Sequence, residues 1–265
     1  MAWIGVMLMA AGVGVIVSKN LDRIGPVAIA TAIFIASAAC YAYAVWRRAS
    51  ARRGMFDEYV LLLGALILSA DVGYIEHQFH LLGADWPRHF IVLAAIHGVT
   101  AYYFDSAALV SLSVAALASW FGIERNADAF FTNRIETAGR AFVCAAVIGI
   151  WRLANRRDQF ARVFDHFALN LALWGGLILT FNRETKYLGL PVVVMLSVGT
   201  ILHGFRQRTE SFVMYGFVYG VIAVIYVLVD FVREPVIGLA IVTVAMGFAV
   251  AGLYLLHDRF KRSVA

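Results

Sequence analysis

Two ionisable side chains lie deep inside neighbouring apolar runs of the sequence. Asp71 falls within residues 59–75 and His97 within residues 89–104. The turn between the runs centres near Ala84, 13 residues from each side chain, so on adjacent antiparallel helices the two would lie at matching depth. In a low dielectric a carboxylate and an imidazole can share a proton, since each offsets the desolvation of the other. The spacing predicts a buried protonation or cation site at Asp71 and His97.

A second polar group follows at the end of the same apolar run. Glu76 and His80 are four residues apart and share a face if the helix continues to His80, and His77 is three residues before His80. We place these three side chains at the outer mouth of the site. His77 and His80 are candidate ligands for zinc or a similar ion, but the spacing defines no further ligand and the sequence specifies no cofactor.

A structural role is the alternative interpretation for each of these residues. Asp71 could accept hydrogen bonds from Ser69 or Tyr74, and His97 could simply bond across helices. The three side chains at the outer mouth could simply be exposed to solvent, without a functional role. The sequence contains no nucleotide-binding loop, no serine-nucleophile motif and no zinc-protease motif. ATP-driven transport by this chain alone is therefore not expected, and enzymatic activity is the less favoured class.

The composition indicates what kind of protein must position these groups. Hydrophobic residues make up 62% of the chain and charged residues 15%, and the mean hydropathy is +0.79. These values are typical of membrane proteins and not of soluble domains. The net charge of +5 comes from residues in short loops beside apolar runs, so it predicts orientation in a membrane and not nucleic-acid binding.

Ten apolar runs have about the length that a membrane span needs. Because each span must satisfy its own backbone hydrogen bonds in lipid, we expect an all-α, polytopic transmembrane helical bundle of about ten helices in a single integral membrane domain, residues 1–265. We expect the first run to be a retained helix and not a cleaved signal peptide. The expected spans are 2–18, 24–46, 57–79, 89–104, 106–123, 137–154, 164–181, 189–205, 212–231 and 236–256.

The loop charges predict the orientation of these spans. With both termini in the cytoplasm, the inner segments hold 13 Lys and Arg residues and the outer segments 8. The strongest inner clusters fall at 47–53 and 152–162. Positive charge concentrates on the cytoplasmic side of membrane proteins, so the bias favours cytoplasmic termini.

The stretch Gln78-Phe-His-Leu-Leu-Gly-Ala-Asp-Trp-Pro87, with the apolar hairpin around it, resembles a bacterial family. The family comprises predicted multi-pass inner-membrane proteins grouped under a domain of unknown function, with a similar aromatic-His-Leu-x-Gly turn. The runs 20–24 and 61–68 also look family-like, and the resemblance covers about the first 123 residues. It implies a bacterial inner-membrane location and carries no activity.

The function we expect is that of an inner-membrane transporter or ion-conducting protein. Its partners would be the lipid bilayer and a small ion or metabolite, with a second copy of the chain or another membrane protein as further candidates. One alternative is a non-catalytic subunit or scaffold of an envelope complex. Another is an intramembrane enzyme acting on lipid or quinone.

Overall fold

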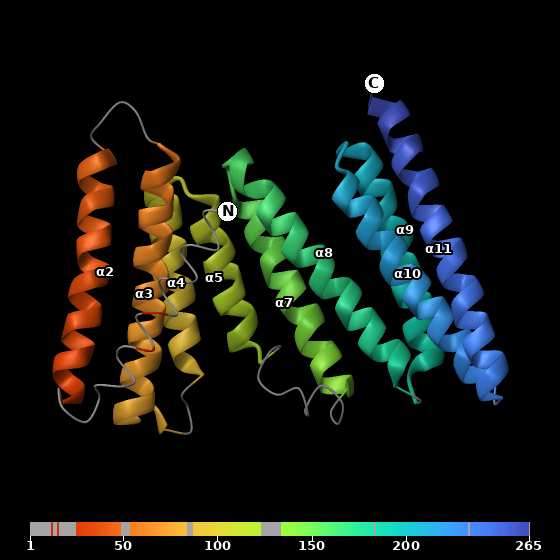
Figure 1. Ribbon diagram of the computed structural model, residues 1–265, viewed down its shortest axis with the longest axis horizontal. Coiled ribbons are helices and arrows are strands. Elements are labelled where there is room, and N and C mark those ends of the chain that lie inside the picture. Colours follow the sequence, from red (N-terminus) through yellow and green to blue (C-terminus); the bar gives the residue numbers. More distant parts are fainter. Residues whose placement is uncertain are drawn as a thin grey trace. The chain divides into compact units, whose positions relative to one another are not determined.

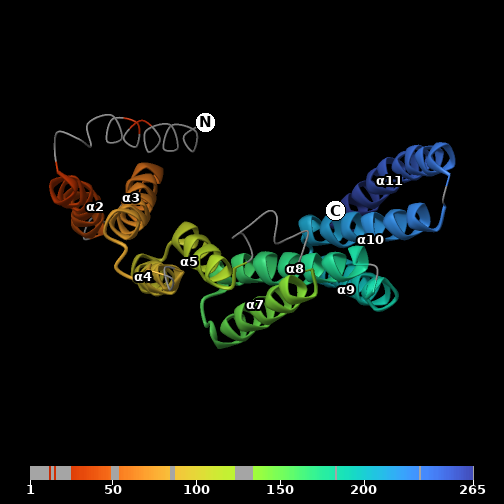
Figure 2. The ribbon, with the colours of Figure 1, turned by 90° about the horizontal axis from the view of Figure 1, so that it is seen from below.

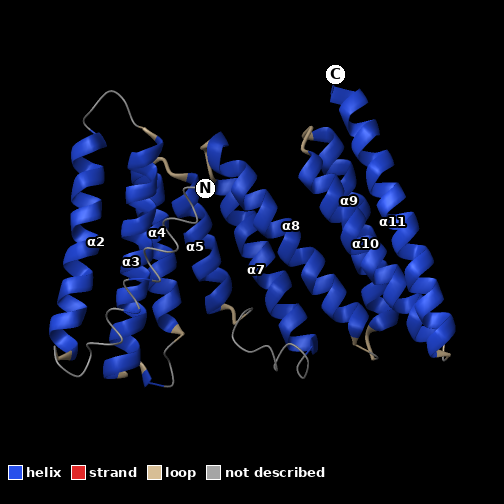
Figure 3. Ribbon diagram, viewed as in Figure 1, coloured by secondary structure: helices blue, strands red, loops and turns tan. Residues whose placement is uncertain are grey.

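A computed structural model describes residues 25–48, 54–83, 87–122, 134–182, 184–232 and 234–264, together with Gly12 and Val15. Within these residues the chain forms nine helices and no strand (Figures 1 and 3). The chain divides into two compact units, residues 1–120 and 121–265. The predicted all-α class is therefore confirmed, while the single domain stays a prediction.

The first unit contains four described helices that alternate in direction. They are α2 (Pro26–Arg48), α3 (Met55–Phe79), α4 (Arg88–Phe104) and α5 (Ala107–Trp120). Helix α2 packs along α3, and α4 packs along α5, while α3 contacts both α4 and α5 (Figure 1). Short connections between long apolar helices favour this up-and-down order, because a short loop places consecutive helices side by side and antiparallel.

The second unit contains five helices in the same up-and-down order. They are α7 (Arg134–Ala154), α8 (Asp158–Phe181), α9 (Lys186–Arg206), α10 (Glu210–Phe231) and α11 (Pro235–Val264). Consecutive helices pack on one another, and α10 also contacts α8, which Figure 2 shows from below. A small core of Leu173, Leu177, Val193 and Ala223 lies where α8, α9 and α10 meet.

Seven of these helices are long and apolar enough to cross a membrane. They correspond to predicted spans two, three and six to ten. Helices α4 and α5 occupy the predicted spans 89–104 and 106–123, but with 17 and 14 residues they are shorter than the other described helices. The predicted first span, 2–18, lies outside the described residues apart from Gly12 and Val15. The total of about ten and the side on which the termini lie therefore stay predictions.

A reversal of two residues joins α4 to α5. Asp105 adopts the left-handed conformation, with φ 57° and ψ 38°, and its N–H donates to Ala101 O at the end of α4. Asp tolerates this conformation better than most side chains do. The buried Ser106 then starts α5, with its Oγ accepting from Leu109 N at 3.4 Å. The predicted spans 89–104 and 106–123 are therefore separate helices joined by a tight reversal.

Glycines allow close contact at several helix crossings. A Cβ on Gly64 of α3 would lie 2.8 Å from Cys40 Cβ of α2, and a Cβ on Gly216 of α10 would lie 2.5 Å from Ser197 O of α9. Such approaches bring backbones together, which is how helices in lipid gain packing energy. Gly216 and Gly220 therefore form an intramolecular packing seam between α10 and α9.

Candidate functional site

His97 lies buried between α4 and α3, and its partner there is Ser69. Its Nε2 lies 2.8 Å from Ser69 Oγ, and its side chain is 2% exposed. The sequence predicted Asp71 at this position, two residues further along α3. The predicted depth of the two helices is thus nearly right, but the facing side chain is a hydroxyl and not a carboxylate.

The hydrogen bonds of Ser69 determine which ring nitrogen of His97 carries the proton. Ser69 Oγ lies 2.9 Å from Ala65 O, a carbonyl that can only accept. A hydroxyl has a single hydrogen, so Ser69 donates it to Ala65 and accepts from His97 Nε2–H. This network assigns the proton of the neutral ring to Nε2 and leaves Nδ1 as an acceptor. Nδ1 is buried, and no described residue forms a hydrogen bond with it.

Asp71 is equally buried, on another face of α3. Two residues correspond to about 200° of helix rotation, so Asp71 points away from the side that meets His97. It shares its face with Gly64 and Asp57, seven and fourteen residues earlier, and that face packs on α2. Asp71 is 2% exposed, and its Oδ1 has no hydrogen-bond partner in the described part of the chain. A buried carboxylate without a partner is costly, so a proton or cation would relieve that cost.

The surroundings of Asp71 on α2 are apolar. Gly64 meets Ser37 and Cys40 in this antiparallel pair. Seven residues further along α3, the facing part of α2 is therefore near Ala30 and Ile33, where the chain offers no ionisable side chain. The nearest hydroxyl on α2, that of Thr31, already donates to Val27 O at 2.8 Å. Among the described residues, the part of α2 that faces Asp71 therefore offers no counter-charge.

Glu76 holds the turn that follows α3. Its two carboxylate oxygens accept from Leu82 N at 3.2 and 3.1 Å. The helix ends at Phe79, and His80 adopts the left-handed conformation with its N–H donating to Glu76 O. The shared face of Glu76 and His80, which required helix up to His80, is therefore not formed. A carboxylate that accepts backbone N–H groups in this way stabilises the turn.

His77 and His80 are exposed at the same end of α3. Their rings lie 6.4 Å apart between centroids, tilted by 36°. The described part of the chain contains no group of three or more His, Cys, Asp or Glu side chains placed to hold a metal ion. The two imidazoles alone supply too few ligands for a structural zinc site.

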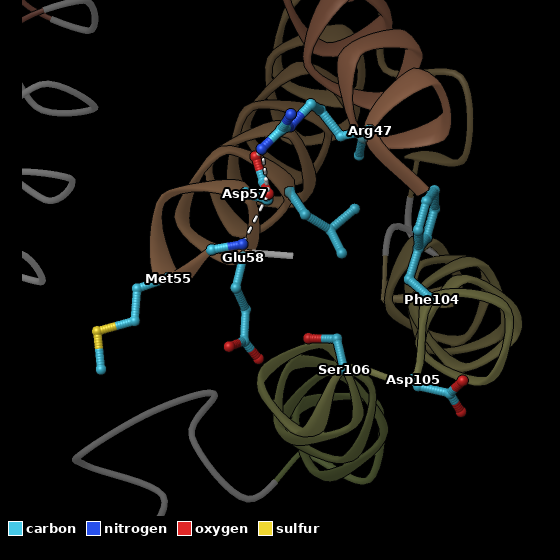
Figure 4. Close-up of a pocket in the computed structure, with 10 residues that line it drawn as sticks. Arg47, Met55, Asp57, Glu58, Phe104, Asp105 and Ser106 are labelled. Atoms are coloured by element: carbon cyan, nitrogen blue, oxygen red, sulfur yellow. Dashed lines mark hydrogen bonds and ion pairs between the residues drawn. The ribbon is translucent and has the colours of Figure 1, made fainter. Parts of the chain in front are cut away.

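The opposite end of α3 carries an ion pair that the sequence analysis did not identify. Asp57 Oδ1 lies 3.1 Å from Arg47 Nε, and Figure 4 shows the two side chains facing each other across the ends of α2 and α3. Asp57 also accepts from Tyr43 OH at 3.0 Å and from Gly54 N at 2.9 Å. Arg47 Nη2 also lies 3.4 Å from Asp57 Oδ2, so four donor atoms contact this buried carboxylate. The sequence signal was an Arg at the end of one apolar run and an Asp at the start of the next.

Polar groups in the second unit pair mostly at helix ends. Arg152 and Asp165 lie 3.2 Å apart between Nε and Oδ1, and Lys186 Nζ lies 2.6 Å from Asp230 Oδ2. Further inside, Tyr219 OH donates to Asn170 Oδ1 at 3.3 Å. These contacts pin neighbouring helices together. The second unit therefore offers no counterpart, among its described residues, to the unpaired carboxylate in the first.

Helices of this length and apolarity, with ionisable groups held inside them, define an α-helical membrane protein with several spans. Residues 1–110 match the family model described as "Predicted membrane protein (DUF2157)". The resemblance inferred from the sequence is thereby confirmed for these residues, which include Asp71, His97 and the turn between α3 and α4. No curated protein and no solved structure matches the chain.

Proposed function

We propose that this chain is a transporter or ion-conducting protein of the bacterial inner membrane, in which Asp71 and His97 take up a proton or a cation. The main support is that Asp71 Oδ1 and His97 Nδ1 are both buried without a hydrogen-bond partner among the residues that the structure describes. Each atom can accept a proton or coordinate a cation without breaking an existing bond. Stability alone gives no reason to keep such acceptors inside apolar helices.

In this proposal the first unit has an outer end, at the turn between α3 and α4, and a cytoplasmic end. Asp71 is eight residues from the end of α3 at Phe79, which corresponds to about 12 Å along the helix. Glu76, His77 and His80 lie between Asp71 and the adjoining turn, at the expected outer mouth. The other end of the first unit carries the arginine cluster 47–53 and faces the cytoplasm, as do both termini.

Thermal stability of the detergent-purified protein across pH and a panel of Na⁺, K⁺, Mg²⁺ and Zn²⁺ tests this site. A cation at about 100 times its dissociation constant should stabilise the fold by about 2.7 kcal/mol. We expect the dependence on cation or pH to disappear in Asp71→Asn and in His97→Gln, and to persist in the exposed control Glu136→Gln. An unchanged dependence in both site variants, or none in the unmodified protein, would contradict the proposal.

A further inference from the structure

A cavity of about 330 Å³ opens at the end of the first unit away from the α3–α4 turn. It lies among the last turn of α2, the first turns of α3 and the reversal between α4 and α5 (Figure 4). Its volume is in the range of small-molecule sites, roughly 300–1,000 Å³. It does not include Asp71 or His97, so it is separate from the site proposed above.

The floor of the cavity is apolar and buried. Ala44, Leu61 and Phe104 line it, with exposed fractions of 6%, 5% and 4%. Such a surface accommodates the hydrocarbon part of a ligand and excludes water from it. The ring of Phe104 adds a face that attracts cations.

The two charges of the ion pair on one wall of the cavity neutralise each other. Arg47 is bound to Asp57 through Nε at 3.1 Å and Nη2 at 3.4 Å. Asp57 in turn is saturated by Tyr43 OH and Gly54 N. This wall therefore presents no unmatched charge to a ligand, and an anion would have to compete with Asp57 for the guanidinium.

Glu58 and Ser106 supply the polar groups that remain. The carboxylate of Glu58 extends toward the hydroxyl of Ser106 across the cavity (Figure 4). Glu58 forms no hydrogen bond or ion pair with the described residues, and buried Ser106 accepts only the long contact from Leu109 N. Asp105 also lines the cavity, but its carboxylate points outward (Figure 4). One negative charge and one hydroxyl therefore face an apolar floor.

We propose that this cavity binds a primary alkylammonium group, with the ammonium between Glu58 and Ser106 and the hydrocarbon part on Leu61 and Phe104. An ammonium has three donors, which a carboxylate and a hydroxyl oxygen can accept. It is protonated at neutral pH, as a lysine side chain is. The group can belong to a free amine or to the ethanolamine headgroup of a lipid, because the cavity lies at the end of membrane-spanning helices.

Binding of n-butylammonium to the detergent-purified full chain, measured by saturation-transfer NMR at constant ionic strength, tests the proposal. We expect saturable binding that n-butanol, which has the same hydrocarbon part and no charge, does not reproduce. Glu58→Gln keeps the size of the side chain and should weaken binding at least tenfold. Asp105→Asn removes an equal charge that points away and should change the affinity less than twofold.

Several outcomes would overturn this assignment. These are no binding to the unmodified chain, equal binding of n-butanol, or equal effects of Glu58→Gln and Asp105→Asn. Since Glu58 has no partner in the described structure, Glu58→Gln should keep the thermal midpoint of the parent, which separates loss of binding from loss of fold. His97→Gln should bind n-butylammonium as the parent does, so this test and the test of the proposed function can fail independently.

Lipid nanodiscs identify the source of the group. A lower affinity for n-butylammonium in phosphatidylethanolamine than in phosphatidylcholine would show that the ethanolamine headgroup competes for the cavity, because the quaternary choline group has no N–H to donate. Equal affinities in the two lipids would identify a free amine as the ligand. Both results retain the ammonium site.

Discussion

At the scale of single residues, the main feature is the hydrogen-bonded group of Ala65, Ser69 and His97. The hydroxyl of Ser69 relays one hydrogen bond to Ala65 O and receives one from His97, so it fixes the ring orientation as well as the position of its proton. An orienting partner of this kind is what a buried imidazole needs in order to present one defined nitrogen. In the proposed function, Nδ1 is the atom of His97 that takes up a proton or a cation.

Ser69→Ala should destabilise the protein by about 1–3 kcal/mol, because it leaves the Nε2–H of His97 buried without an acceptor. The matched control is Ser111→Ala. Ser111 also donates to the carbonyl four residues earlier, at 3.0 Å, but contacts no imidazole. Reversible unfolding in mixed micelles measures both variants. Equal changes in the free energy of unfolding would show that Ser69 does not hold His97.

The sequence predicted the depth of His97 better than its partner. Counting residues from the turn predicted, to within two positions, which residue of α3 lies at the depth of His97. This works because helices rise by a constant amount per residue. It could not give the rotation of α3 about its axis, which a single step changes by about 100°. Rotation is set by packing against α2, and there Gly64 and Asp57 lie on the contact face. Asp71 lies on the same face of α3 as these two residues and therefore points away from His97.

At the scale of helices, hydropathy predicted most boundaries closely. Helix α3 was expected at 57–79 and is Met55–Phe79, and α10 was expected at 212–231 and is Glu210–Phe231. The larger differences occur where a helix continues beyond the apolar run. Helix α8 begins at Asp158 although the run begins at 164, because Phe160 and Phe164 bury one side of a polar first turn. Mean hydropathy does not detect such an amphipathic turn, because it combines the apolar face and the polar face in one value.

Helix packing in the second unit depends on the contact of α9 with α8 at Gly189. A Cβ there would lie 2.3 Å from Thr180 N and 2.5 Å from the carbonyl carbon of Leu179, both backbone atoms that cannot move aside. Gly189→Ala should therefore destabilise the protein by about 1–3 kcal/mol. Gly199→Ala on the same helix meets nothing within 4 Å and should be neutral, or stabilising by up to about 1 kcal/mol.

Thermal unfolding of the two alanine variants in the same detergent makes the comparison direct. The predicted result is a lower midpoint for Gly189→Ala and an equal or higher midpoint for Gly199→Ala. If both substitutions shifted the midpoint equally, the close crossing of α8 and α9 would be wrong.

At the scale of the whole molecule, apolar side chains cover the outside of the helices. On α11, for example, Leu239, Phe248 and Tyr254 are 69%, 74% and 71% exposed. Such surfaces are stable in lipid and not in water. The buried ionisable groups Asp71 and His97 are the contrast to this exterior, since lipid gives them no partner either. The molecule therefore combines an exterior suited to the bilayer with unpaired acceptors inside its first unit.

If Asp71 and His97 serve the passage of an ion, the purified chain should carry an ion flux across proteoliposome membranes. Vesicles that contain a trapped pH dye, and are given a proton, Na⁺ or K⁺ gradient, report movement coupled to protons. We expect vesicles with the parent chain to dissipate the gradient faster than empty vesicles. The rate should fall at least tenfold in His97→Gln and in Asp71→Asn. It should equal the parental rate in His257→Gln, which removes an imidazole from the second unit. Rates in the two site variants equal to those of the parent, or a parent no faster than empty vesicles for every gradient, would contradict the proposed function.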